Sequence, residues 1–180
     1  MFMSVFKTAP RGGDAVAVWR DTGSASADVA GGTGQIGGQG DLYFAMSSAP
    51  MGGPDILGCD PVTSVAAPWA LRLDEVAFPV GAIAHRHTHA GSGWRHLVSG
   101  RLRIETDHGA QIIETGMSWF EPANSPVRAV ALQTSGVTRF VRCMVIPQSF
   151  VGLSTFQLCN PKDAELERLQ LTHRHFDHIL

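Results

Sequence analysis

Three histidines near the middle of the chain have a spacing that could support metal chemistry. His85, His87 and His89 stand two residues apart in a segment that is predicted to be a β-strand. Alternate side chains of a strand project to the same face, so the three imidazoles are expected on one side. Two neutral imidazoles placed in this way can converge on one metal ion, at about 2.0–2.1 Å for zinc. A polar strand exposed to solvent, with Arg86 and Thr88 on its other face, is the alternative.

The strand that carries these histidines is predicted to be one of a series between residues 66 and 147. Turn signals rich in glycine, proline, asparagine and serine separate the strands, and no helical pattern lies between them. The stretch Trp69–Phe78 alternates apolar and polar residues, and its parity slips near Asp74 and Glu75, as at a β-bulge. About eight short strands without intervening helices exclude a βαβ architecture and predict a sandwich or a barrel.

The first 58 residues are predicted to form an irregular, glycine-rich arm that packs on the barrel and adds a few strands to it. More than half of the 20 glycines lie there, and we expect a mobile loop near Gly31–Gly40. The stretch Gly32–Gly37 matches the GxGxxG dinucleotide fingerprint, but more glycines come after it, where a helix would have to begin. We therefore predict no nucleotide binding at this stretch.

Residues 151–180 are predicted to hold one C-terminal helix and a tail. Asn160 can cap the helix, Pro161 occupies its first position, and Leu166 and Leu169 are expected to dock it on the outside of the barrel. The end of the chain, 172–178, matches the HxHxDH signature of metal-dependent hydrolases. No downstream ligands come after it, so we interpret the match as coincidence in a poorly ordered tail.

Composition limits the classes of partner. The chain has 180 residues, 44% of them apolar and 17% charged, and its net charge is −2. This balance argues against nucleic acid and against an anionic membrane surface as partners. No apolar run is long enough to span a bilayer, and three cysteines without CxxC spacing predict reduced thiols. We expect a cytoplasmic protein.

The residues around the histidines resemble the first motif of the cupin superfamily: Gly81, five residues, then His87-x-His89, and later Gly100. The stretch 116–127 resembles the second motif, a glycine, five residues, then a proline turn. The resemblance covers about residues 66–150. It implies an all-β fold, a cupin-like double-stranded β-helix or jelly-roll barrel, which we place at residues 59–150, and we expect a homodimer.

The resemblance also implies a divalent transition metal such as Fe, Ni, Zn or Mn. Cupins commonly hold it through two histidines, a glutamate and a third histidine. The paired histidines fall on His87 and His89, the glutamate on Gly93, and the last histidine on Val127. Neither Gly93 nor Val127 can bind a metal. The site is therefore rebuilt from other residues, or weak and adventitious, or an organic-ligand cavity without metal.

Two residues could complete a rebuilt metal site. Glu121 is favoured over His85, because it comes from a different strand, whereas three successive ligands along one strand would need a twist. Trp119 is expected to wall the same pocket, as is Val127. Arg95 at the pocket rim suits a carboxylate or another anionic substrate, and an ordinary surface arginine is the alternative.

Two functions of different classes are consistent with these expectations. The first is a metal-dependent small-molecule enzyme of the oxygenase, isomerase or lyase type, with His87 and His89 as ligands. The second is a non-enzymatic, small-molecule-binding or regulatory barrel in which the histidines only hydrogen-bond a ligand. A mainly structural role is a third possibility, and the sequence names no substrate.

Overall fold

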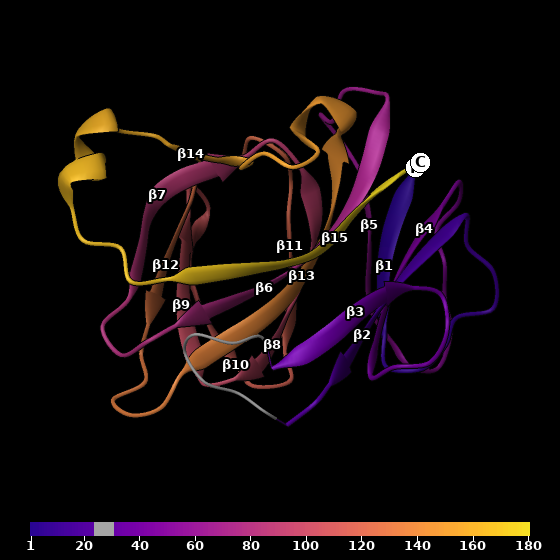
Figure 1. The fold of residues 1–180 in the computed structure, drawn as a ribbon, viewed down its shortest axis with the longest axis horizontal. Helices are drawn as coiled ribbons and strands as arrows, with labels where there is room; N and C mark the ends of the chain where they lie inside the picture. The colour runs from indigo at the N-terminus through magenta and orange to yellow at the C-terminus, as the bar shows by residue number, and fades with distance from the viewer. Residues whose placement is uncertain (24–30) are drawn as a thin grey trace.

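In the residues that the structure describes, the fold is almost entirely β-structure, in three antiparallel sheets of five strands each (Figure 1). The structure is a computed structural model that describes residues 1–23 and 31–180. Two sheets enclose a barrel, and the third packs outside it. This confirms the predicted all-β jelly-roll fold. No helix among the described residues is long and apolar enough to cross a membrane.

The first barrel sheet, called the β6 sheet below, has the strand order β11-β8-β13-β6-β15. Its strands are β6 (Trp69–Phe78), β8 (Ser92–Ser99), β11 (Ser118–Glu121), β13 (Thr138–Pro147) and β15 (Leu171–Ile179). The pairing of β6 with β13 is continuous along the whole of β6. The bulge predicted near residues 74–75 is therefore absent from this pairing; a register shift lies instead in β15, between Arg174 and Phe176.

The second barrel sheet, called the β7 sheet, has the order β10-β9-β12-β7-β14. Its strands are β7 (Ile83–His89), β9 (Arg101–Thr106), β10 (Gly109–Glu114), β12 (Val127–Ala131) and β14 (Phe156–Leu158). The two barrel sheets bury an apolar cluster between them that includes Phe78, Leu97, Ile104 and Phe140.

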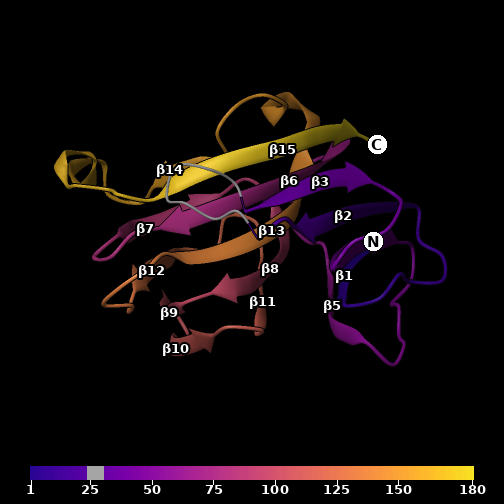
Figure 2. The ribbon, with the colours of Figure 1, turned by 60° about the horizontal axis from the view of Figure 1, so that its bottom comes forward.

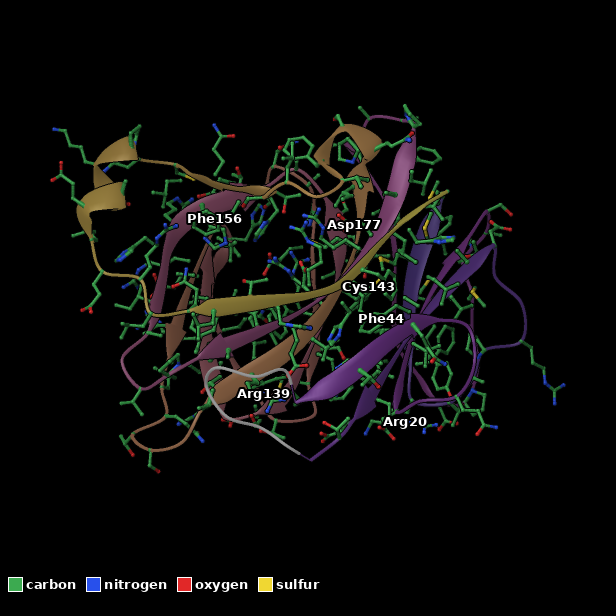
Figure 3. The ribbon with its side chains drawn as sticks, viewed as in Figure 1. Arg20, Phe44, Arg139, Cys143, Phe156 and Asp177 are labelled. Atoms are coloured by element: carbon green, nitrogen blue, oxygen red, sulfur yellow. The ribbon has the colours of Figure 1, made fainter. Side chains whose placement is uncertain are left out.

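The N-terminal residues are more regular than predicted. They form a sheet with the order β3-β2-β4-β1-β5, made of β1 (Phe2–Phe6), β2 (Ala15–Asp21), β3 (Gly32–Ile36), β4 (Leu42–Ser47) and β5 (Ile56–Pro61). This sheet packs on the outer face of the β6 sheet, where Phe44 and Cys143 belong to one apolar core (Figure 3). The barrel wall is thus buried on both faces.

The loop predicted near residues 31–40 is in large part strand β3, and its glycines have a packing role. A Cβ at Gly32 would lie 2.3 Å from the Trp19 indole, and one at Gly34 would lie 2.7 Å from the Cβ of His175. Glycine at these positions lets β3 approach both β2 and β15, and Figure 2 shows β3 and β15 running alongside each other.

The predicted C-terminal helix is wrong. Asn160 does accept a hydrogen bond from the Lys162 backbone N–H, but it starts only one 3-10 turn, η2 (Pro161–Glu165). A second 3-10 turn, η1 (Gln148–Phe150), ends β13. Leu166 and Leu169 stay 49% and 37% exposed, so no core supports a helix there. The chain instead extends into β15, which pairs with β6 along almost its whole length.

Candidate functional site

A cavity of about 410 Å³ lies inside the barrel, between the β6 and β7 sheets. Inward-facing side chains divide it into two halves. On β6, Arg72 and Asp74 precede Val76 and Phe78, so that strand contributes a polar half and then an apolar half. The same division appears on the neighbouring strand β13, where Arg142 and Phe140 both line the cavity. The cavity therefore suits a ligand with a polar head and an apolar body.

His87 and His89 both point into the polar half, and His85 does not. In the pairing of β12 with β7, Val127 is opposite His87 but Ala129 is opposite Ala84, so β7 holds one extra residue. A bulge of this kind changes which side chains face inward. His85 consequently lies outside the cavity lining, with its Nε2 3.1 Å from the Glu167 carbonyl oxygen.

The hydrogen bonds of the two inward histidines define their tautomers. His87 Nδ1 lies 2.7 Å from the His85 carbonyl oxygen, which can only accept, so His87 carries its proton on Nδ1. Arg142 Nη1, which can only donate, lies 3.1 Å from His89 Nε2. His89 therefore carries its proton on Nδ1, which donates to Thr155 Oγ1 at 3.1 Å. Both Nε2 atoms hold lone pairs.

The two Nε2 atoms lie close together inside the cavity. His87 Nε2 and His89 Nε2 are 3.2 Å apart, and the side chains are 5% and 6% exposed. Phe156 stacks on the His87 ring with centroids 4.2 Å apart, and it also lines the cavity. With the proton of His89 on Nδ1, its Nε2 does not donate to His87 Nε2, which is then an acceptor without a donor among the described residues.

Burial and positive charge keep both imidazoles neutral. Burial is the main cause that lowers both pKa values, and the neighbouring cations Arg142 and Arg95 act in the same direction. The pKa of His87 is lowered to about 4, and that of His89 well below its ordinary value. At pH 7 the pair therefore acts as acceptor or metal ligand, and it supplies no charge of its own.

Arg142 is held in the cavity by an acidic partner. Its Nε donates to Asp74 Oδ2 at 3.0 Å, and its Nη2 lies 2.9 Å from the same oxygen. The two side chains are 11% and 1% exposed. Together with the contact of Nη1 to His89, the guanidinium uses three of its five N–H groups. The remaining two, one N–H on Nη1 and one on Nη2, have no acceptor among the described residues.

Glu121 and Arg95 form the second ion pair of the site. Arg95 Nη2 lies 2.8 Å from Glu121 Oε2, and Trp119 Nε1 donates to Glu121 Oε1 at 2.8 Å. Arg95 is fully buried and also donates to the Gly93 carbonyl oxygen at 2.6 Å. Both carboxylate oxygens of Glu121 are thus engaged by Arg95 and Trp119, so Glu121 does not act here as the additional ligand that the sequence favoured. Arg95, Trp119 and Val127 all line the cavity.

The two positions at which the sequence departs from the cupin pattern are filled without ligands. A Cβ at Gly93 would lie 2.0 Å from the Cys143 carbonyl oxygen and 2.7 Å from the Met144 Cα, so no side chain fits there. Val127 is 3% exposed and presents an apolar surface beside His87.

A metal ion fits this donor set poorly. The separation of the two Nε2 atoms is compatible with a metal ion. If each nitrogen lay about 2.1 Å from an ion, their observed separation of 3.2 Å would give an N–metal–N angle of about 100°. No third histidine, cysteine, aspartate or glutamate among the described residues joins them in a metal-binding group. The guanidinium of Arg142 already occupies the His89 Nε2 lone pair. The donor set therefore supports no step through a metal.

The contribution of the C-terminal strand to the site was not predicted from the sequence. The cavity lining includes alternate residues of β15 and the segment before it: Arg168, Gln170, Thr172 and Arg174. Gln170 Oε1 and Arg174 Nε are buried without a hydrogen-bond partner in the structure. The period of two in 168–174 was the available signal, because it indicates a strand with one polar face rather than a helix.

The comparisons with known proteins identify the barrel. Residues 74–141 match the family model of the cupin domain. The chain carries a cupin domain. No curated protein matches the chain.

The barrel is also similar to solved cupin structures. A cupin domain from Bordetella pertussis is 20% identical, with 42% of this chain and 81% of that chain covered and a TM-score of 0.37. An RmlC-like cupin from Shewanella frigidimarina is 22% identical, with 45% and 71% covered and a TM-score of 0.40. The polyketide cyclase RemF from Streptomyces resistomycificus is 18% identical, with 42% and 54% covered and a TM-score of 0.39.

Proposed function

We propose that the cupin barrel binds a small organic carboxylate, with its carboxylate in the polar half of the cavity and an apolar body in the other half. One observation carries this proposal. In the described part of the chain, Glu121 is the one acidic residue that lines the cavity, whereas five arginines line it: Arg72, Arg95, Arg142, Arg168 and Arg174.

The charge excess remains after the acidic partners of the lining arginines are counted. Asp177 pairs with Arg72 at 2.6 Å, and Asp74 pairs with Arg142. With Glu121, three carboxylates stand against five guanidinium groups. Each buried arginine of the lining has one of these carboxylates as its partner. The surplus charge therefore lies on Arg168, which is exposed, and on Arg174, whose side chain is 32% exposed. Positive charge that lines a cavity attracts an anion, and guanidinium groups bind carboxylates with well-defined geometry.

The apolar half of the cavity determines which body the carboxylate ligand should carry. Val76, Phe78 and Phe140 line it, together with Ile104 and Trp119. Burial of an aromatic or branched body against these side chains contributes about 25 cal/mol for each Å² removed from water. A phenyl-substituted carboxylate therefore matches both halves.

The test compares phenylacetate with phenethylamine, which keeps the phenyl ring and replaces the carboxylate with an ammonium group. Isothermal titration calorimetry on the full chain should detect phenylacetate and not phenethylamine. The double change Asp74→Asn, Arg142→Met removes the guanidinium without leaving an unpaired buried carboxylate, and it should weaken the binding of phenylacetate about 10- to 100-fold, the value of a charge-assisted hydrogen bond.

Arg103→Met is the matched control, because Arg103 lies on the exposed face of β9 with about half its side chain in water. It should leave the affinity for phenylacetate unchanged. Equal binding of the amine and the acid, or equal effects of the two arginine changes, would show that the cavity is not an anion site.

A metal-dependent enzyme is the alternative function, and the separation of the two imidazole nitrogens is the observation that favours it. It requires stoichiometric metal in protein made without an affinity tag. It also requires loss of that metal in the double change His87→Ala, His89→Ala. Binding of phenylacetate that survives treatment with a chelator favours the metal-free carboxylate site instead.

A further inference from the structure

The positive charge of the cavity has an unusual position relative to the two histidines. Arg142 Nη1 approaches His89 Nε2 to 3.1 Å, and His89 Nε2 is 3.2 Å from His87 Nε2. The guanidinium thus lies against the pair of nitrogens that, by resemblance to other cupins, would hold a metal ion.

A guanidinium and a metal ion compete for the same atom of an imidazole. Each needs the lone pair of the unprotonated nitrogen, and Arg142 already uses that of His89. A metal ion on both histidines would have to displace Arg142 from His89 and then remain next to a guanidinium. The two positive charges would repel each other in a site where water screens them little.

The structure also shows why Arg142 stays in place. Asp74 is 1% exposed and contacts both Nε and Nη2 of Arg142. Moving the guanidinium away would leave that carboxylate buried without its partner, which is strongly unfavourable. The arginine is therefore built into the wall of the cavity and is not a mobile side chain that happens to point inward.

We propose that the guanidinium of Arg142 takes the place of a metal ion as the cation that receives the ligand. The proposal rests on the proposed function, since it assumes that the cavity binds an anion. The two N–H groups of Arg142 without an acceptor among the described residues supply the contacts to the carboxylate. The histidines then orient the guanidinium and accept hydrogen bonds.

The experiment measures Co²⁺ binding by the full, untagged chain through the visible absorption of the metal. Each protein is compared with the same protein carrying His87→Ala, so that Co²⁺ held by the C-terminal histidines cancels. The test variant is the double change Asp74→Asn, Arg142→Met, which removes the guanidinium without leaving an unpaired buried carboxylate. Arg142→Lys keeps a cation there, and Arg103→Met is the surface control.

The proposal predicts no His87-dependent Co²⁺ signal in the wild type, in Arg142→Lys or in Arg103→Met. It predicts that the double variant gains one Co²⁺ per chain and loses it when His87→Ala is added. His87-dependent Co²⁺ binding by the wild type overturns the proposal. So does a double variant that is folded by circular dichroism and gains no Co²⁺.

Two further readouts keep the result interpretable. If the double variant does not fold, the wild type decides: a His87-dependent Co²⁺ signal overturns the proposal, and its absence together with phenylacetate binding after chelation supports it. Failure of the proposed function gives a different result, because chelated wild type would then bind no phenylacetate whatever the Co²⁺ titrations show.

Discussion

The open acceptor on His87 has a consequence for ligand choice at the scale of single residues. Its Nε2 carries a lone pair and belongs to a buried side chain. This atom lies 3.2 Å from His89 Nε2, which in turn lies 3.1 Å from Arg142 Nη1. A buried acceptor without a donor costs about 1–3 kcal/mol, and a ligand that supplies the donor recovers part of this. A hydroxyl group next to the carboxylate is well placed to do so.

Mandelate, which is phenylacetate with one added hydroxyl, should therefore bind about 10-fold more tightly than phenylacetate. The change His87→Ala should remove this preference, because the acceptor is then absent. Competition calorimetry on both proteins measures the ratio. A preference for mandelate that persists in His87→Ala would place the hydroxyl elsewhere.

Gly93 offers a second test at this scale. A Cβ there would press on the backbone of β13, 2.0 Å from the Cys143 carbonyl oxygen. Gly93→Ala should lower the free energy of unfolding by about 1–3 kcal/mol or more, as overpacking does in well-packed sites. Chemical denaturation measures this, with Gly52→Ala as a control at a glycine whose Cβ would meet nothing within 4 Å and whose φ lies outside the left-handed region. Equal losses in the two variants would contradict the packing argument.

The site residues that could be predicted are those whose chemistry shows in local spacing. The alternation of His87 and His89 places both in one cavity, and the motif positions of Trp119 and Val127 place them in its wall. His85 could not be excluded in this way, because a single extra residue in β7 changes its face. The ion pair of Arg142 with Asp74 could not be predicted, since it depends on strand pairing that the sequence does not show.

At the scale of elements, β15 takes the place of the predicted helix. The cap at Asn160 was identified correctly, but a cap fixes only the start of a helix. Partners distant in the chain decide the conformation beyond the cap: β6 offers backbone hydrogen bonds, and Arg72 offers an ion pair to Asp177. These contacts link residues far apart in sequence, as the 105-residue separation of Arg72 and Asp177 shows.

Asp177→Ala should therefore destabilise the protein far more than loss of the exposed leucine does. Arg72 is 1% exposed, and removal of one member of a buried ion pair typically costs about 3–5 kcal/mol. Leu166→Ala should change the free energy of unfolding by about 0.5 kcal/mol or less, because Leu166 packs on no core. Urea denaturation distinguishes the two. A large decrease in the free energy of unfolding for Leu166→Ala would instead support the docked helix that the sequence predicted.

At the scale of the whole molecule, a buried acidic residue joins the barrel to the N-terminal sheet. Glu75 on β6 accepts a hydrogen bond from the Gly31 backbone N–H at 2.7 Å and one from Trp19 Nε1 at 3.3 Å. It also pairs with Arg139. The contacts to Gly31 and Trp19 link the β6 sheet to β2 and to the start of β3. The homodimer and the bound metal expected from the sequence remain predictions.

The same residue should make stability depend on acid. Burial raises the pKa of the Glu75 carboxyl, but His175, Gly31 and the charge of Arg139 outweigh burial and lower that pKa to about 2. Because the pKa in the folded state is below the ordinary value of 4.5, the stabilisation is complete above about pH 4.5. It is lost as the pH falls from there toward about 2.

Glu75→Gln should consequently flatten the fall in stability between about pH 4.5 and pH 2, and lower the free energy of unfolding near pH 7 by a few kcal/mol. Thermal denaturation at a series of pH values measures both effects. Glu114→Gln is the control, because Glu114 forms an exposed ion pair with Arg101. An identical pH profile of stability for wild type and Glu75→Gln would show that the contacts of Glu75 do not stabilise the protein in this pH range.

The most direct test of the account is a crystal structure of the full chain grown with 4-bromophenylacetate, located by the anomalous signal of its bromine. The account predicts a carboxylate within about 2.7–2.9 Å of the Arg142 guanidinium nitrogens, and a bromine in the apolar half beside Phe78 and Phe140. A ligand bound outside the barrel, or one inside it whose carboxylate contacts a metal ion on His87 and His89 and not Arg142, would contradict it.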